Sequence, residues 1–292
     1  MRLEDLEITI LVTTGAAGSF YMQSLFDSHP EILMIPYAFE YPELCEEMRD
    51  ASEIEWADRV VKYLSHIFEN KKTSMHGDFT NYKASESIFR KCLIQELKRI
   101  GLTRTGIVYA VHTAFNQATN GDLEGKRVLF LHVHHLSKVE WAKSVREDFP
   151  NAKFVYMVRR PAVMIQSFIT SNLRYLNVSL TDSFRPFCLG LEFLATYPAI
   201  IANMLFLSGI SKIIKLEDLH SEFESVMTDL AQFVGIGFNE TLLNSTMGGK
   251  PLIYSSPNNR NLKGKTVSLS KLSHKDYYSK EELNFLETLF QD

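Results

Sequence analysis

Short apolar runs alternate with amphipathic segments along much of the chain. Runs rich in Ile, Val, Leu and Phe predict strands at residues 8–12, 107–111, 128–133, 154–158 and 212–216, and a helical period predicts helices at 86–100, 138–149, 162–172 and 222–234. Strands that are apolar throughout are buried on both faces, as in a parallel sheet between two layers of helices. The pattern therefore predicts an α/β fold with three layers, α/β/α, and a central parallel β-sheet flanked by helices.

The length of 292 residues and the hydrophobic content of 45% fit a single domain over residues 1–292. We expect a helical insertion at about 41–125 and a C-terminal lid loop at about 244–275, where Ser, Asn, Gly and Lys are frequent. The apolar stretch 187–210 approaches the length of a membrane span, but Glu192, Pro198 and Asn203 interrupt it. A buried helix pair broken near Pro198 is favoured, and an apolar wall facing a substrate is the alternative.

Charge and cysteine usage narrow the possible function classes. The net charge of −4 argues against general nucleic-acid binding, so any anion site must be local. The three cysteines form no C-x-x-C pair, which indicates a reducing compartment and neither a disulfide framework nor a zinc site. The acidic N-terminal sequence MRLEDLE is not that of a signal peptide. We therefore expect a cytoplasmic protein with no nucleic-acid or membrane partner.

The first predicted strand runs into a turn of small residues that opens a helix. Glycines let the backbone approach an anion, and the first N–H groups of a helix favour negative charge. The alternative is that the glycines only make a tight turn between strand and helix. The turn lacks the lysine of the G-x-x-x-x-G-K-[ST] loop, so it is not a nucleotide-triphosphate loop. The candidate anion-binding residues are Thr14, Gly15, Ala16, Ala17, Gly18, Ser19 and Phe20.

Three later segments carry residues suited to a nucleotide. Residues 153–168 (KFVYMVRRPAVMIQSF) form a strand, then Arg159, then a helix that carries Ser167. Residues 213–235 form a strand, the triplet Glu217-Asp218-Leu219 and an amphipathic helix. Residues 260–265 (RNLKGK) form a basic loop. A further segment, residues 27–31, follows the helix that the turn opens and reads DSHPE. A surface ion pair for Arg159 and an ordinary helix serine at Ser167 are the alternatives to phosphate binding.

Together these segments resemble the sulfotransferase superfamily, whose donor is 3′-phosphoadenosine 5′-phosphosulfate (PAPS). The resemblance implies a P-loop-like α/β fold and transfer of a sulfuryl group to a hydroxyl or amine of a small-molecule acceptor. It implies that the turn after the first strand binds the 5′-phosphosulfate and that Arg159 and Ser167 bind the 3′-phosphate. It also implies that Lys263 and Gly264 belong to a lid that closes on the nucleotide. No metal is expected, the product is 3′-phosphoadenosine 5′-phosphate (PAP), and the oligomeric state stays open.

A histidine cluster follows the strand at 128–133. The segment resembles the K-T-H-L-P segment of cytosolic sulfotransferases, which implies that His134 is the general base and that His132 stands where the family has lysine. Alternation along a strand places His132 and His134 on one face. A metal site and purely structural histidines are the alternatives. Two carboxylates, Glu40 and Asp78, compete for the role of base, although each could instead be a solvated or capping group.

The chain departs from the family pattern at its lysines. Ala16 stands where the phosphosulfate loop usually has Lys or Arg, and Arg160 stands where the family usually has Asp, which puts the usual local salt bridge in doubt. Compensation by His132, Arg160 or lysines of the lid is one possibility, because loss of such a cation costs about a hundredfold or more in rate. The alternative is a sulfotransferase-fold protein that acts as a nucleotide-binding or regulatory module or catalyses another reaction.

Overall fold

Five parallel strands form the central sheet. In the computed structural model, which describes residues 5–13, 17–69, 72–73, 77–134, 139–160, 164 and 210–252, they run in the order β2-β5-β1-β6-β7. Their bounds are β1 (Glu7–Thr13), β2 (Ile32–Met34), β5 (Val128–Val133), β6 (Lys153–Val158) and β7 (Ser211–Lys215). The sheet confirms the predicted parallel α/β architecture. The strand predicted at 8–12 is β1, the central strand of the sheet.

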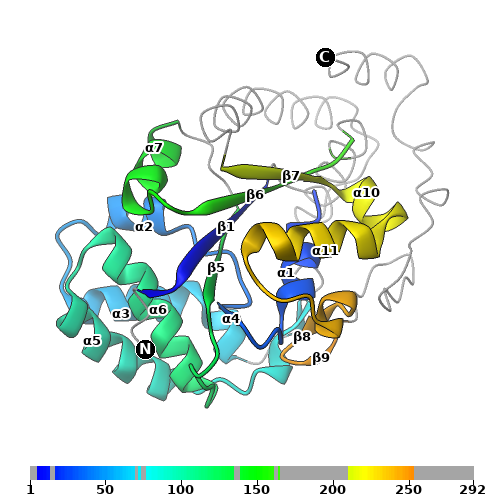
Figure 1. The fold of residues 1–292 in the computed structure, drawn as a ribbon. Helices are drawn as coiled ribbons and strands as arrows, with labels where there is room; N and C mark the ends of the chain where they lie inside the picture. Colours follow the sequence, from blue (N-terminus) through cyan, green and yellow to red (C-terminus); the bar gives the residue numbers. More distant parts are fainter. Residues whose placement is uncertain are drawn as a thin grey trace, which may run out of the picture.

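Helices pack on both faces of this sheet (Figure 1). The described helices are α1 (Ser19–Phe26), α2 (Tyr41–Glu47), α3 (Glu53–Tyr63), α4 (Ser65–Phe68), α5 (Glu86–Ile100), α6 (Arg104–Ala118), α7 (Val139–Asp148), α10 (Leu216–Ser221) and α11 (Phe223–Val234). Two short 3-10 turns, η2 (Phe79–Asn81) and η3 (Glu240–Leu243), and two small hairpins, β3 (Lys72–Thr73) with β4 (Gly77–Asp78) and β8 (Thr246–Met247) with β9 (Lys250–Pro251), complete the described elements.

The alternation of side chains along β1 divides the core into two clusters. Ile8, Ile10 and Val12 pack with α2, α3, α5, α6 and α7. Leu11, one residue out of step, packs with α1, α10 and α11 on the opposite face. Successive side chains of a strand point to opposite faces, so an apolar strand can bury both of them. This double burial is why the central strands read as unbroken apolar runs.

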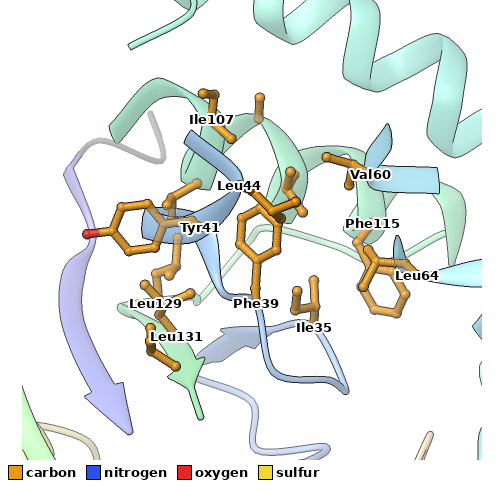
Figure 2. Packing of buried hydrophobic residues seen from close by; sticks show 14 of the residues in the cluster. Ile35, Phe39, Tyr41, Leu44, Val60, Leu64, Ile107, Phe115, Leu129 and Leu131 are labelled. Atoms are coloured by element: carbon orange, nitrogen blue, oxygen red, sulfur yellow. The ribbon is translucent and has the colours of Figure 1, made fainter. Parts of the chain in front are cut away.

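The larger cluster is built around the chain that follows β2 (Figure 2). Phe39, Tyr41 and Leu44 lie between the sheet residue Leu129 and the helices α3 and α6. Phe39 and Tyr41 are fully buried, and the phenol of Tyr41 donates to a carboxylate oxygen of Asp148, 3.0 Å away. The packing holds residues 35–44 against the end of β5, which matters for the site described below.

The prediction of a strand at 107–111 is wrong, because these residues belong to α6. Thr103 caps this helix by accepting a hydrogen bond from the backbone N–H of Gly106, 3.0 Å away. Eleven residues of α6 are buried, so the helix is covered nearly all round and its sequence lacks a clear amphipathic period. The fifth strand is instead β2, which has only three residues and therefore gave no strand signal.

A histidine lies inside this buried helix. His112 is fully buried, and its Nδ1 lies 2.8 Å from the carbonyl oxygen of Val108. Burial lowers the pKa of His112 from 6.5 to about 4, since the charged ring would lose its hydration, while the bond to Val108 opposes the shift. The folded chain therefore holds this ring neutral at pH values where an unfolded chain binds a proton.

Acid is expected to destabilise the fold through His112. Because its folded pKa is depressed, the stability present above about pH 6.5 is lost as the pH falls toward 4, by about 3 kcal/mol in total. The His112→Leu variant lacks this titration. Between pH 7 and pH 4, its free energy of unfolding should therefore fall by about 3 kcal/mol less than that of the wild type. Urea unfolding at several pH values measures the difference. Parallel stability curves for the two proteins would contradict the assignment.

Candidate active site

The turn between β1 and α1 ends in a glycine that no other residue replaces easily. Gly18 precedes the first helical residue, Ser19, with a φ of +89°, in the left-handed region. A Cβ at this position would come within 2.9 Å of a methyl carbon of Leu216. The turn therefore packs directly against α10. Ser19 is buried, whereas Thr14, Gly15 and Ala16 lie outside the described residues.

The first turn of α1 lies between the end of β5 and the helix α10. On one side, the ring of Phe20 meets that of His132 edge-on, with centroids 5.1 Å apart. On the other side, the ring of Tyr21 stacks on that of His220 in α10 at 5.6 Å. The first turn of α1 has no acidic residue. An anion approaching this helix terminus therefore meets backbone N–H groups and no opposing carboxylate from α1 itself.

His132, near the end of β5, and His134, just after it, point to the same side of the sheet, as predicted. The rings of His132 and His134 lie 5.8 Å apart, and both are neighbours of Phe20. His132 pairs in register with Leu11, whose side chain packs with α1. His132 is 1% exposed, whereas His134 is half-buried. His134 is therefore the more accessible of the two rings to a bound molecule.

Glu40 is held next to this histidine pair. Its carboxylate accepts a hydrogen bond of 2.6 Å from the backbone N–H of His134. The backbone N–H of Phe39 donates to the carbonyl of His132 at 2.7 Å, so the chain before α2 is fastened to the end of β5. The hydroxyl of Tyr63 donates to the carbonyl of Ala38 and lies 3.4 Å from the backbone nitrogen of Glu40. Three of the four predicted catalytic candidates, His132, His134 and Glu40, are thus brought together.

The fourth candidate, Asp78, has only its backbone described. It forms β4 with Gly77, and its Cα pairs with that of Lys72 in the β3–β4 hairpin. The following residue, Phe79, is fully buried in η2, and its ring lies 6.3 Å from that of Tyr37, which in turn contacts Phe20. The segment is therefore near the cluster, and the role of the Asp78 carboxylate stays a prediction.

An aromatic wall adjoins the histidine pair. Its rings come from four separate segments of the chain, Phe20, Tyr37, His66 and Phe79. Tyr37 is the central member, with its ring 5.8 Å from Phe20 and 4.1 Å from His66. Burial raises the pKa of Tyr37, and the charge of Glu40 adds to the effect. Burial also lowers the pKa of His66, so the wall is neutral near pH 7.

Sequence reasoning did not find Tyr37, His66 or Phe79 as site residues. Their positions in the sequence show no common motif, because α4, η2 and the loop after β2 meet only in the folded chain.

Arg159 lies directly after β6, at the opposite end of the candidate site. Burial lowers the pKa of Arg159, while the nearby Glu217 carboxylate raises it. Burial, and secondarily the Arg159 charge, lower the pKa of His220 in the same neighbourhood. Arg159 therefore brings a partly desolvated positive charge to the edge where the turn and α1 begin. A partly desolvated guanidinium is suited to bind a phosphate.

Arg160, the residue expected to disturb a local salt bridge, makes one. Its backbone N–H donates to a carboxylate oxygen of Glu217 at 3.0 Å, and its guanidinium Nε lies 3.6 Å from the same oxygen. Glu217 is the first residue of the Glu-Asp-Leu triplet, so this ion pair joins the end of β6 to α10. The triplet itself lies in the short helix α10 and not at the end of a strand.

The DSHPE segment, residues 27–31, lies at the opposite end of the strands from the candidate site, where β2 and β5 begin. The Asp27 carboxylate is 6% exposed and accepts hydrogen bonds from the hydroxyls of Tyr82 and Thr246, each 2.8 Å away, and from the backbone N–H of Gly249 at 3.0 Å. His29 and Glu31 bind the backbone of Gly237. These contacts fasten later parts of the chain to α1, so the segment is structural in the described part of the molecule.

The predicted lid, at about 244–275, begins with the residues that bind the Asp27 carboxylate. Gly248 and Gly249 have φ values of +60° and +73° and form the two-residue turn between β8 and β9. The hydroxyls of Ser24 and Ser245 lie 2.6 Å apart, which ties the same stretch to α1. The remaining predicted nucleotide ligands, Ser167, Lys263 and Gly264, lie outside the described residues, as does the apolar stretch 187–209.

Within the residues that the structure describes, no group of three or more His, Cys, Asp or Glu side chains could hold a metal ion. Within the same ranges, no helix has both the length and the apolar character to cross a bilayer.

The fold and these residues define a class of protein. It is a three-layer α/β protein whose candidate site lies at the carboxyl ends of parallel strands, where such folds bind their ligands. The model of the sulfotransferase family matches residues 11–240, and the chain belongs to that family.

Solved structures agree on the fold. The chain is similar to the sulfotransferase domain from the curacin biosynthetic pathway, with a TM-score of 0.57 and 15% identity over 99% of this chain and 98% of that one. It is also similar to the sulfotransferase domain of the olefin synthase from Synechococcus PCC 7002, with a TM-score of 0.53 and 16% identity over 98% and 95% of the two chains. A comparison with curated proteins gives no match.

Proposed function

We propose that this protein transfers a sulfuryl group from PAPS to a hydroxyl or amine of a small-molecule acceptor. The observation that carries the proposal is the meeting of His134, Glu40 and the first turn of α1 at one edge of the sheet. Membership of the sulfotransferase family supports the reaction class. PAPS is the donor that the family resemblance implies, and it would supply the sulfuryl group and a stable leaving group, PAP.

The described residues fit an anionic nucleotide. The turn before α1 requires glycine at Gly18, and the helix that follows has no acidic residue in its first turn. In the proposed site, backbone N–H groups of this turn and the Ser19 hydroxyl hold the 5′-phosphate. Arg159 binds the 3′-phosphate through its planar guanidinium, and Ser167 does so from the following segment. Lys263 and Gly264 belong to the proposed lid.

The acceptor needs a base that removes its proton as the new bond to sulfur forms. His134 suits this task because an imidazole titrates near neutral pH and the ring is half-buried beside Phe20. Glu40 accepts the backbone N–H of His134, so its carboxylate is near enough to be the alternative base. The aromatic wall of Phe20, Tyr37, His66 and Phe79 would hold the apolar body of the acceptor.

The second candidate function is a nucleotide-binding protein of the same fold without efficient sulfuryl transfer. The replacement of the loop cation by Ala16 and of a second family lysine by His132 favours it. His132 is 1% exposed, which makes a charged ring there more costly than an exposed lysine. Catalysis remains the proposal because a histidine, a neighbouring carboxylate and the aromatic wall lie beside the start of α1.

Two measurements separate these functions. Isothermal titration calorimetry should detect one molecule of PAP bound per chain, more tightly than adenosine 5′-phosphate. Incubation with 35S-labelled PAPS and a panel of phenols, alcohols and amines should then give a labelled product. Binding without transfer to any acceptor favours the nucleotide-binding module, and absence of PAP binding would contradict both functions.

A further inference from the structure

A glutamine of α1 lies beneath the histidine pair. Gln23 is 3% exposed, and its side chain reaches two separate parts of the chain. Its amide nitrogen lies 2.7 Å from the carbonyl oxygen of Ile35 and 3.5 Å from that of Tyr37. Its amide oxygen lies 3.0 Å from Nδ1 of His132. No sequence motif singled out this residue, which follows the candidate anion-binding turn by one turn of helix.

The two carbonyls determine which way the amide faces. A backbone carbonyl only accepts hydrogen bonds, so the group nearest Ile35 and Tyr37 must be the NH2. The flipped amide would place an oxygen against two other oxygens at these distances and would forfeit a buried hydrogen bond. The amide oxygen of Gln23 therefore faces His132.

This orientation decides which nitrogen of His132 carries a proton. An amide oxygen only accepts, so Nδ1 of the ring must donate. Nδ1 then carries a proton in the neutral ring as well as in the charged ring. Any proton that His132 gains or loses must be exchanged at Nε2, on the far side of the ring from Gln23. The edge-on contact with Phe20 and the burial of the ring further restrict its rotation.

We propose that Gln23 is a positioning residue that holds His132 in the Nδ1–H tautomer and leaves Nε2 as the nitrogen that exchanges a proton. The proposal rests on the proposed function for what Nε2 does in the reaction, which is to hold or donate a proton where related enzymes use lysine. The same amide joins the chain after β2, which carries Tyr37 and leads to Glu40, to the end of β5. One side chain thus sets the ring of His132 and the position of the segment that lines the acceptor side.

The tautomer is measurable in the free protein by long-range 1H–15N correlation spectra of the histidine rings, assigned through bonds from the backbone. Wild-type His132 should show a protonated Nδ1 and an unprotonated Nε2 near pH 8. The other tautomer in the wild type would overturn the proposal, and this test needs no variant, no donor and no acceptor. It therefore stands apart from the test of sulfuryl transfer, since failure of the latter leaves the tautomer unaffected.

Variants test whether Gln23 is the cause. Gln23→Met removes the acceptor, so the Nε2–H form, which a free imidazole side chain prefers, should appear. Gln117→Met, at an exposed glutamine of α6, is the matched control and should change nothing. In a transfer assay, Gln23→Met should lower kcat about 10–100-fold, as losses of orienting partners do. A folded Gln23→Met protein with an unchanged tautomer would overturn the role of Gln23.

Discussion

Replacing Arg159 by alanine is expected to weaken PAP binding about 10–100-fold, because each hydrogen bond to a charged group contributes about 1.5–3 kcal/mol. The guanidinium is partly desolvated at the end of β6, where burial already lowers its pKa, so its interaction with a phosphate is little screened by water. Adenosine 5′-phosphate lacks the 3′-phosphate and should lose far less affinity. Calorimetric titration of both nucleotides against wild type and variant measures the difference.

The matched control for this variant is Arg127→Ala. Arg127 precedes β5 at the opposite edge of the sheet, where its guanidinium lies 3.2 Å from the Glu31 carboxylate and is 59% exposed. Its removal should leave both affinities unchanged, since the pair is solvated and far from the carboxyl ends of the strands. Equal losses of affinity for the two nucleotides in Arg159→Ala would exclude Arg159 as the ligand of the 3′-phosphate.

Replacing His134 by alanine is expected to lower turnover about 10²–10⁴-fold, the range that a general base contributes. The backbone N–H of His134, which binds Glu40, remains in this variant, so the chain before α2 should keep its place. PAP binding should be unchanged, because the ring lies beside Phe20 in the aromatic wall, whereas the proposed 3′-phosphate ligand Arg159 follows β6. Initial rates with 35S-labelled PAPS, together with calorimetry of PAP, separate loss of chemistry from loss of binding.

Glu40→Gln is the companion variant, because an amide can still accept the backbone N–H of His134 but takes up no proton from the acceptor. If His134 is the base, Glu40→Gln should retain most of the activity. Loss of turnover in Glu40→Gln, with most activity kept in His134→Ala, would make Glu40 the base and contradict the proposal for His134. Asp78 is the remaining carboxylate to test if both variants are active.

Much of the sheet could be predicted because each of these strands is marked by a continuous apolar run in its own sequence. The predicted strand at 128–133 and the predicted helix at 86–100 coincide with β5 and α5, and those at 154–158 and 212–216 differ from β6 and β7 by one residue at most. Burial on both faces produces the apolar runs that mark such strands. The same rule failed at 107–111, since a helix covered on nearly all sides also carries an apolar run.

The candidate site could be predicted where charged or titratable side chains stand at the end of a strand. His132, His134 and Arg159 stand directly at or after predicted strands, and parallel strands bring their carboxyl ends to one edge. The family, too, could be recognised from ordered segments, and the match over residues 11–240 agrees with it.

The amino-acid sequence by itself thus determined the α/β class, the edge of the sheet that carries the candidate site and the glycine turn that opens α1. Only the tertiary structure decided that Glu40 holds the backbone of His134, that Gln23 faces His132, and that Tyr37, His66 and Phe79 form one wall. It also decided that the Asp27–Glu31 segment is an anchor at the far edge. The physical reason is that these contacts join residues distant in sequence, through hydrogen bonds and ring packing that exist only once β2, β5 and the helices around them are assembled.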